Sequence, residues 1–182
     1  MQRVGFKEWA LVCEAIGRGE QTILLRKGGI AEGRQGFGFR YREFFLFPTF
    51  FHEQVLKTRK ADAEMPPPVP GQIGIRYFAK LEIEQEITAW ETAARLAPFH
   101  ILAESVVRER FEYRQAGLHV AFVRVFRLTA SWIFPDKPAY GGCRSWVDLP
   151  DCPADLEMSP VLSDAEHEKR IGRFRSLADR LD

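Results

Sequence analysis

The stretch from Ile73 to Glu84 constrains the fold of this chain more than any other. Apolar residues occupy every second position there, and most of the positions between them are charged. Period two over this length is typical of a β-strand. A second run, LHVAFVRVFRL at 118–128, is apolar on both faces, which indicates a central strand. We therefore expect a core built on a β-sheet.

Shorter patterns place the remaining elements around these two strands. They predict strands at 21–26 and 44–47 and helices at 6–16, at 50–57, between Thr88 and the proline at 98, and beyond Ser163. Thr49 is the expected N-cap of the second helix, while Thr88 and Ser163 open capping boxes. The stretch 101–113 fits a helix followed by a strand. Because no regular βα unit repeats, we predict an α+β fold, a compact curved sheet or small barrel flanked by helices.

The length of 182 residues fits one domain with a tail. We predict a single α+β domain over residues 1–150, interrupted at 58–71 by an exposed connection that contains the sequence MPPPVPG. Consecutive prolines exclude both a helix interior and a central strand. Residues 151–182 are expected to form an extension whose amphipathic helix packs on the same domain.

Composition and motifs exclude several classes of function. The net charge of +1 removes any global attraction to nucleic acid or membrane, and no apolar run is long enough to span a bilayer. Three cysteines, an odd number, favour free thiols in a reducing compartment, so we expect a cytoplasmic protein. The four histidines are scattered, and the P-loop and dinucleotide motifs are missing. We expect neither a metal nor a cofactor.

The first candidate segment joins cations to glycines at the end of a predicted strand. Backbone N–H groups that no Cβ shields, next to positive side chains, can hold a phosphate or a carboxylate. Its candidate ligand-binding residues are Arg26, Lys27, Gly28, Gly29, Arg40 and Arg42, and its candidate catalytic residue is Glu32. The alternative is a solvated hairpin with arginines lying on the surface.

The second candidate segment follows the strand at 44–47. If Thr49 caps a helix, then His52, Glu53 and Gln54 lie in its first turn or so, where the N–H groups and the helix dipole favour an anion. The dipole would also keep His52 neutral as an acceptor or base. The alternative is that His52 and Gln54 satisfy local backbone groups.

The third candidate segment is Tyr140–Trp146, with the sequence YGGCRSW. Trp146 could stack on a base, Arg144 and Ser145 could bind polar groups, and Cys143 beside Arg144 could be nucleophilic. The alternative is a loop anchored by a buried Trp146, with an inert Cys143. Separately, a buried Arg124 would need a carboxylate, for which Glu32 or Glu43 is the expected partner.

The chain resembles a bacterial family known as domain of unknown function 1802. The likeness lies in FKEWALVCEAIGRGEQTILLRKGGIAEG, FFLFPTFFHEQ, GLHVAFVRVFRL and YGGCRSWVDL, which occur in that order. The resemblance implies an occasional link with restriction-modification or defence, and through it a tendency towards nucleic acid. The order of the first elements is also similar to small RNA-binding or base-binding barrels of the PUA-like, ASCH and EVE type.

Three hypotheses of function follow. The leading one is a module that binds nucleic acid or a nucleotide-like, phosphate-bearing ligand, with cations on the phosphates and His52, Gln54 and Trp146 facing the base. The alternative is a hydrolase or nuclease that uses His52 with a carboxylate, Glu32 or Glu53, or Cys143 as nucleophile. The third is a subunit that docks through the Pro-rich connection and the C-terminal helix. The first two depend on the candidate segments meeting in one cleft, and the charge on its walls would then separate a binding module from a catalyst.

Overall fold

The computed structural model describes residues 2–27, 38–60 and 64–178. Within them, seven strands form one sheet in the order β2-β5-β4-β3-β1-β6, with β7 pairing to β5. The strands are β1 (Val4–Trp9), β2 (Ile23–Arg26), β3 (Glu43–Thr49), β4 (Gln72–Ile87), β5 (Leu118–Pro135), β6 (Trp146–Asp148) and β7 (Met158–Pro160). The α-helices are α1 (Ala10–Gly17), α2 (Trp90–Arg95), α3 (Glu104–Glu112) and α4 (Asp164–Ala178), and 3₁₀ turns lie at His52–Lys57, Ala97–Phe99 and Pro138–Tyr140.

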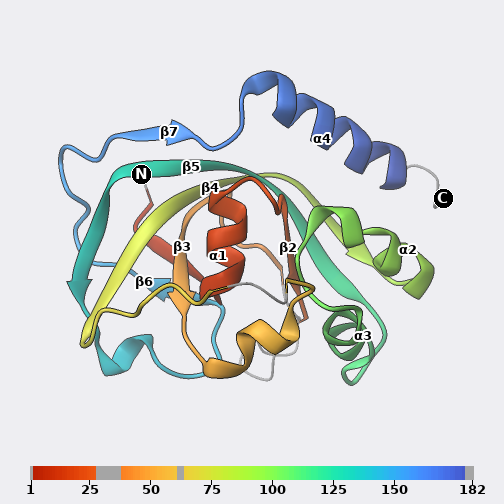
Figure 1. Ribbon diagram of the computed structural model, residues 1–182, viewed down its shortest axis with the longest axis horizontal. Coiled ribbons are helices and arrows are strands. Elements are labelled where there is room, and N and C mark those ends of the chain that lie inside the picture. Colours follow the sequence, from red (N-terminus) through yellow and green to blue (C-terminus); the bar gives the residue numbers. More distant parts are fainter. Residues whose placement is uncertain (1, 28–37, 61–63, 179–182) are drawn as a thin grey trace.

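The two strong strand patterns form β4 and β5, which pair antiparallel and extend further than the patterns did; helices α2 and α3 lie in the chain between them. Register shifts between Ile75 and Tyr77 and between Leu81 and Ile83 interrupt their pairing. Such irregularities bend a strand and increase its twist, and Figure 1 shows both strands curving together around α1. The prediction of an α+β fold with a curved sheet flanked by helices is confirmed.

The sheet is buried on both faces, and the residues of β3 show this directly. Phe44 and Leu46 belong to one core cluster, which also contains α1, whereas Phe45 and Phe47 belong to a second cluster with Trp132 and Tyr140. A short strand that is covered on both faces has apolar residues at every position, as in the sequence FFLF.

The predicted helix at 6–16 is wrong in its first half. Residues 4–9 form β1, which is parallel to β3 with Phe6 opposite Leu46, and the helix begins only at Ala10. Phe6 and Trp9 have helical spacing, but both faces of this strand lie against protein, so apolar side chains three apart do not require a helix. Seven of the eight residues of α1 are buried, consistent with its place inside the curve of the sheet.

Two of the predicted helix starts are also wrong. Thr49 is still in β3, where its hydroxyl donates to the carbonyl of Glu8 at 3.0 Å, and the following 3₁₀ segment begins after Phe51. Helix α2 begins after Ala89 rather than at a Thr88 cap. The N-cap at Ser163 is confirmed, because its Oγ accepts the N–H of Glu166 at 3.3 Å, while Oε1 of Glu166 accepts from Nε of Arg170 at 2.9 Å. The region 101–113 contains helix α3 and no strand.

Helix α4 lies along β5 at the upper margin of Figure 1. The ring of Phe174 packs on Phe122 with the centroids 5.3 Å apart, and His167 Nε2 lies 2.8 Å from Glu82 Oε2. The carboxylate that pairs with Arg124 is Asp164, at the start of this helix. The expectation of Glu43 is therefore wrong for Arg124, because Glu43 pairs with Lys80 at 3.0 Å, and the other expected partner, Glu32, lies outside the described residues.

Gly17, the last residue of α1, lies directly against Tyr77. A Cβ on Gly17 would fall 2.0 Å from Cζ of Tyr77, whose ring is buried and cannot move aside. We expect Gly17→Ala to lower the free energy of unfolding by about 3 kcal/mol through overpacking.

Urea unfolding measures this loss, with Gly74→Ala as the matched control, because a Cβ on Gly74 meets nothing within 4 Å. A loss below about 1 kcal/mol for Gly17→Ala would contradict the proposed contact.

Candidate functional site

Segments far apart in the chain meet at the second half of β1. The guanidinium of Arg26, at the end of β2, donates to the carbonyl of Lys7 and lies over the ring of Phe6 at 4.7 Å. The N–H of Lys7 donates to the carbonyl of Ser145 at 2.8 Å, and its Nζ donates to the carbonyl of Gly142 at 2.9 Å. The first and third candidate segments therefore both lie against one strand.

Strand pairing explains this meeting. β6 runs antiparallel to β1 with Trp146 opposite Phe6, so the residues just before β6 continue alongside Lys7. On the other side, β3 is parallel to β1 and ends opposite Trp9. The backbone of β1 thus sets which side chains come together at its C-terminal end.

Positive charge is concentrated here. Partial burial lowers the pKa of Lys7, and the charges of Arg144 and Arg26 lower it further, against the opposite influence of Asp136 and Cys143. Burial also lowers the pKa of Arg110, which is influenced by Glu8 and Arg26. We call Lys7, Arg26, Arg110 and Arg144 the β1 cationic cluster. Three carboxylates, Glu8, Glu109 and Asp136, act on Lys7 and Arg110 in these interactions, so the four cations are in excess among the described residues.

Glu8 is a carboxylate with only 2% of its surface exposed. Its Oε1 accepts the N–H of Trp9 at 2.8 Å, and its charge acts on the guanidinium of Arg110. A buried carboxylate is stable where positive charge and hydrogen bonds compensate its lost hydration. Glu8 therefore holds part of the cluster in place from inside the fold.

Two aromatic residues border the β1 cationic cluster in different ways. Trp146 is packed among the rings of Phe6, Tyr41 and Phe44, at centroid distances of 4.8, 5.0 and 5.2 Å. Trp9, which is partly buried like Trp146, lies 5.1 Å from the ring of Phe51 and carries the guanidinium of Arg110 over its face at 4.7 Å. Trp146 thus serves packing, and Trp9 is the ring that lies beside the cations.

Two buried donors near Phe6 have no hydrogen-bond acceptor among the residues that the structure describes. They are Nε of Arg26 and Nε1 of Trp146. Buried N–H groups normally have a partner, and those that do not call for an explanation. Their position beside the cluster marks this end of β1 as more polar than packing requires.

An open hollow of about 710 Å³ adjoins the cluster. Lys7 lies on its wall together with Asp136 and Lys137, and its apolar walls include Phe50 and Tyr140. A shallow, partly apolar hollow with lysines on its wall suits an extended anionic ligand better than a small enclosed one.

Two predicted site residues serve the fold instead. Lys27 Nζ donates to the carbonyls of Gly117 at 2.8 Å, Phe111 at 3.4 Å and Gln115, and so closes the end of α3. Gln54 is fully buried and bonded at both ends of its amide to backbone groups of Leu11 and Thr49. We therefore leave both out of the binding site, as the alternative for Gln54 anticipated.

Of the other predicted residues in the described part of the chain, Cys143 influences the pKa of Lys7, whereas Arg40, Arg42 and His52 make no contact with the cluster. Arg40, Arg42, His52 and Cys143 are exposed, and no hydrogen bond connects His52 to Cys143. Glu53 lies 3.8 Å from Lys57, one turn along. The candidates Gly28, Gly29 and Glu32 lie outside the described residues.

Cys13, which precedes Glu14 in α1, is a residue of the core. Cys13 is buried, and burial raises the pKa of its thiol well above the usual value, with Glu8 and Glu14 adding to the effect. In the described ranges, no group of three His, Cys, Asp or Glu side chains could hold a metal ion. Nor is any described helix long and apolar enough to cross a bilayer.

Sequence reasoning missed Lys7, Glu8 and Arg110. A signal for the first two was present, because two charged residues stand side by side in the otherwise apolar run VGFKEWALV. Charges inside an apolar run need partners when the run is buried. Arg110 had no such signal, since it lies in a helix with several other charged residues.

Comparisons with known proteins place the chain in a family. Three crystal structures of the ASCH protein from Zymomonas mobilis are similar to it at 14% identity. The unmodified protein gives a TM-score of 0.49 with 93% of each chain covered. One single-substitution variant of that protein gives a TM-score of 0.49, with 94% of this chain and 98% of the variant covered. A second variant gives a TM-score of 0.47, with 93% of this chain and 94% of the variant covered. None of the curated proteins matches. Residues 5–173 match the family described as "Domain of unknown function (DUF1802)", and the chain belongs to this family.

Proposed function

We propose that this protein binds nucleic acid, or a nucleotide-like ligand, through its phosphates at the β1 cationic cluster. The observation that carries the proposal is the gathering of four cations, Lys7, Arg26, Arg110 and Arg144, around one end of β1, where the three carboxylates that act on Lys7 and Arg110 do not balance them. Arginine and lysine contacts to phosphate supply most of the sequence-independent affinity for nucleic acid. Arg144 is exposed, and Lys7 is half-buried on the wall of the open hollow, so a phosphate can reach both.

Trp9 is the aromatic partner in this proposal. A partly exposed ring with a guanidinium over one face and a neighbouring phenylalanine at its edge resembles the stacking platforms of proteins that bind single strands. We therefore propose single-stranded nucleic acid as the preferred form. Arg40, Arg42 and His52 are not needed for this mode of binding.

The enzymatic alternative has less support. His52 and Cys143 share no hydrogen bond, so neither activates the other in this conformation. The link with restriction-modification or defence rests on the family resemblance alone, and the binding proposal does not depend on it.

The double variant Lys7→Gln/Arg144→Gln is expected to weaken binding to single-stranded RNA or DNA by about tenfold or more. The slope of log K against log salt should also fall by about 1.4, because each lost phosphate contact contributes about 0.7 for single strands. Fluorescence anisotropy with labelled single and double strands between about 50 and 200 mM salt measures both quantities.

The control is Arg95→Gln/Arg175→Gln, which removes the same charge from exposed positions on α2 and α4. Equal losses in the two double variants would show that only net charge matters. Absence of any salt-sensitive binding by the unmodified protein near 150 mM salt would refute the proposal.

A further inference from the structure

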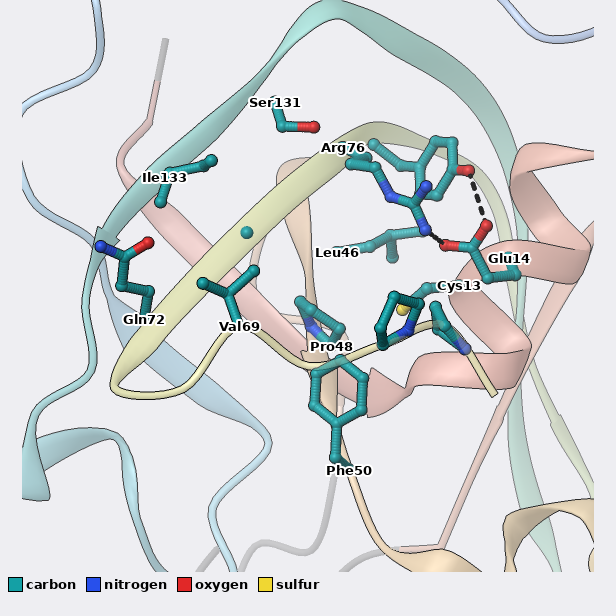
Figure 2. Close-up of a pocket in the computed structure, with 14 residues that line it drawn as sticks. Cys13, Glu14, Leu46, Pro48, Phe50, Val69, Gln72, Arg76, Ser131 and Ile133 are labelled. Carbon is teal, nitrogen blue, oxygen red and sulfur yellow. Dashed lines mark hydrogen bonds and ion pairs between the residues drawn. The ribbon is translucent and has the colours of Figure 1, made fainter. Parts of the chain in front are cut away.

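A second hollow, which shares Pro48 and Phe50 with the first, lies between α1, the Pro-rich connection and strands β4 and β5. It has a volume of about 230 Å³, and Figure 2 shows the residues around it. The walls combine Pro48, Phe50, Val69 and Ile133 with the polar residues Glu14 and Arg76. We call it the α1–β4 pocket. None of the four cations of the β1 cationic cluster lines it.

Exposed apolar side chains gather at this pocket. Among the described residues, five large hydrophobic side chains are exposed, and three of them line it: Phe50, Val69 and Ile133, with 42%, 47% and 53% of their surface exposed. Single exposed hydrophobic residues are normal on protein surfaces, but a group around one hollow indicates a binding surface. The three come from different segments, so the tertiary structure brings them together.

The polar wall of the pocket is organised around Arg76. Its guanidinium pairs with Glu14 through Nη2, as the dashed line in Figure 2 shows, and it lies 5.6 Å from the centre of the Tyr77 ring. The hydroxyl of Tyr77 donates to the other oxygen of Glu14 at 3.3 Å. Both carboxylate oxygens are therefore engaged, whereas Nε and Nη1 of Arg76 have no acceptor in the described residues.

Charge and exposure at this wall favour an anion. The side chain of Arg76 is 43% exposed and that of Glu14 only 15%, so a ligand meets the guanidinium first. Arg127 also acts on the Tyr77 hydroxyl, which makes two cations against one carboxylate around this group. A guanidinium has five N–H donors, and it can hold a second carboxylate on the edge that Glu14 leaves free.

We propose that the α1–β4 pocket binds a small organic acid, with its carboxylate on the free edge of Arg76 and its apolar body against Phe50, Val69 and Ile133. The volume is below the range usual for drug-sized ligands, which limits the body to one or two rings or a short chain. This binding is separate from the proposed recognition of nucleic acid, because the anionic group contacts Arg76 and not the β1 cationic cluster.

The test uses the full chain and two matched probes, indole-3-acetate and its neutral analogue indole-3-acetamide. Titration calorimetry gives affinities, and amide shifts in ¹H–¹⁵N spectra locate the site. We expect saturable binding of the acid, with shifts centred on Gly74, Arg76 and Ile133, and binding of the amide weaker by about tenfold. Benzoate and 4-phenylbutyrate extend the test to a shorter and a more flexible acid.

Variants separate the two walls. Arg76→Gln is expected to weaken binding of the acid by about tenfold and to leave that of the amide within about twofold. Ile133→Ser acts on the apolar wall and is expected to weaken both probes several-fold. Lys80→Gln is the matched control, because Lys80 is an exposed cation of the same strand that pairs with Glu43 and does not line the pocket. If Arg76→Gln does not fold, Arg76→Lys and Ile133→Ser still test the two walls.

The proposal is overturned if none of the three acids shows saturable binding up to about 10 mM. It is also overturned if acid and amide bind equally, if Lys80→Gln weakens binding as much as Arg76→Gln, or if the shifts map elsewhere. Sedimentation provides the last check, since self-association abolished by Ile133→Ser would show that a second copy of the chain covers this surface instead.

Discussion

Replacing His100 by asparagine is expected to make the stability of the protein much less sensitive to acid. His100 is buried, and its Nδ1 accepts the N–H of Leu102 at 3.1 Å. Burial lowers its pKa to about 3 from the usual 6.5, and the nearby charges of Arg59 and Arg110 contribute to the shift. The imidazole is therefore neutral in the folded protein throughout the ordinary pH range.

The direction of the effect follows from linkage between protonation and folding. Below pH 6.5 the unfolded chain takes up a proton at this histidine and the folded protein does not, so stability falls as the pH is lowered from about 6.5 to about 3. At the acid end of this range, the stability lost through His100 is about 4–5 kcal/mol. Each unit between the pKa values of the folded and unfolded states corresponds to about 1.4 kcal/mol. Above pH 6.5 the contribution is constant.

Asparagine is the suitable replacement because its side-chain oxygen can accept the Leu102 N–H but does not titrate. Urea unfolding at several pH values should show a steeper loss for the unmodified protein than for His100→Asn. His52→Asn is the control, since it removes a histidine from an exposed position. Parallel pH profiles for the unmodified protein and His100→Asn would contradict the assignment.

The substitution Gln54→Leu is expected to lower the free energy of unfolding by about 4 kcal/mol. Gln54 Oε1 accepts the N–H of Leu11 at 3.1 Å, and its Nε2 donates to the carbonyl of Thr49 at 2.7 Å. Leucine has a similar size but leaves both backbone groups without a partner. Each unsatisfied buried group costs about 1–3 kcal/mol.

The loss is concentrated at the start of α1. The N-cap position of this helix is Trp9, whose side chain makes no capping hydrogen bond, and Leu11 carries one of the N–H groups that a cap would normally satisfy. Gln54 supplies that bond from 43 positions away in the sequence. The amide of Leu11 should therefore exchange with solvent faster in Gln54→Leu.

Leu56→Ala is the matched control for this prediction, because Leu56 belongs to the same 3₁₀ segment and is 84% exposed. Its effect on stability should stay within about 0.5 kcal/mol. A similar loss in both variants would mean that the 3₁₀ segment itself, rather than the two hydrogen bonds of Gln54, supports the helix.

The structure also changes how the candidate segments are understood. Arg26 and Arg144 both act on the pKa of Lys7, whereas Lys27 and Gln54 are fully used by the backbone that they support. A cation or amide in a loop looks the same in sequence whether it faces a ligand or a helix terminus. Only the position of the carbonyl groups around it distinguishes the two roles.

The sequence by itself determined the strands at 73–84 and 118–128, the capped start of the last helix and the curved-sheet class of the fold. These features depend on local periodicity and on side chains a few residues apart, which one segment contains completely. The tertiary structure alone decided that residues 4–9 form a strand, that Asp164 pairs with Arg124, and that Lys7, Glu8 and Arg110 gather at one place. Those outcomes depend on strand pairing and burial between distant segments. The free energy of these interactions exceeds the preference of any single segment for one secondary structure.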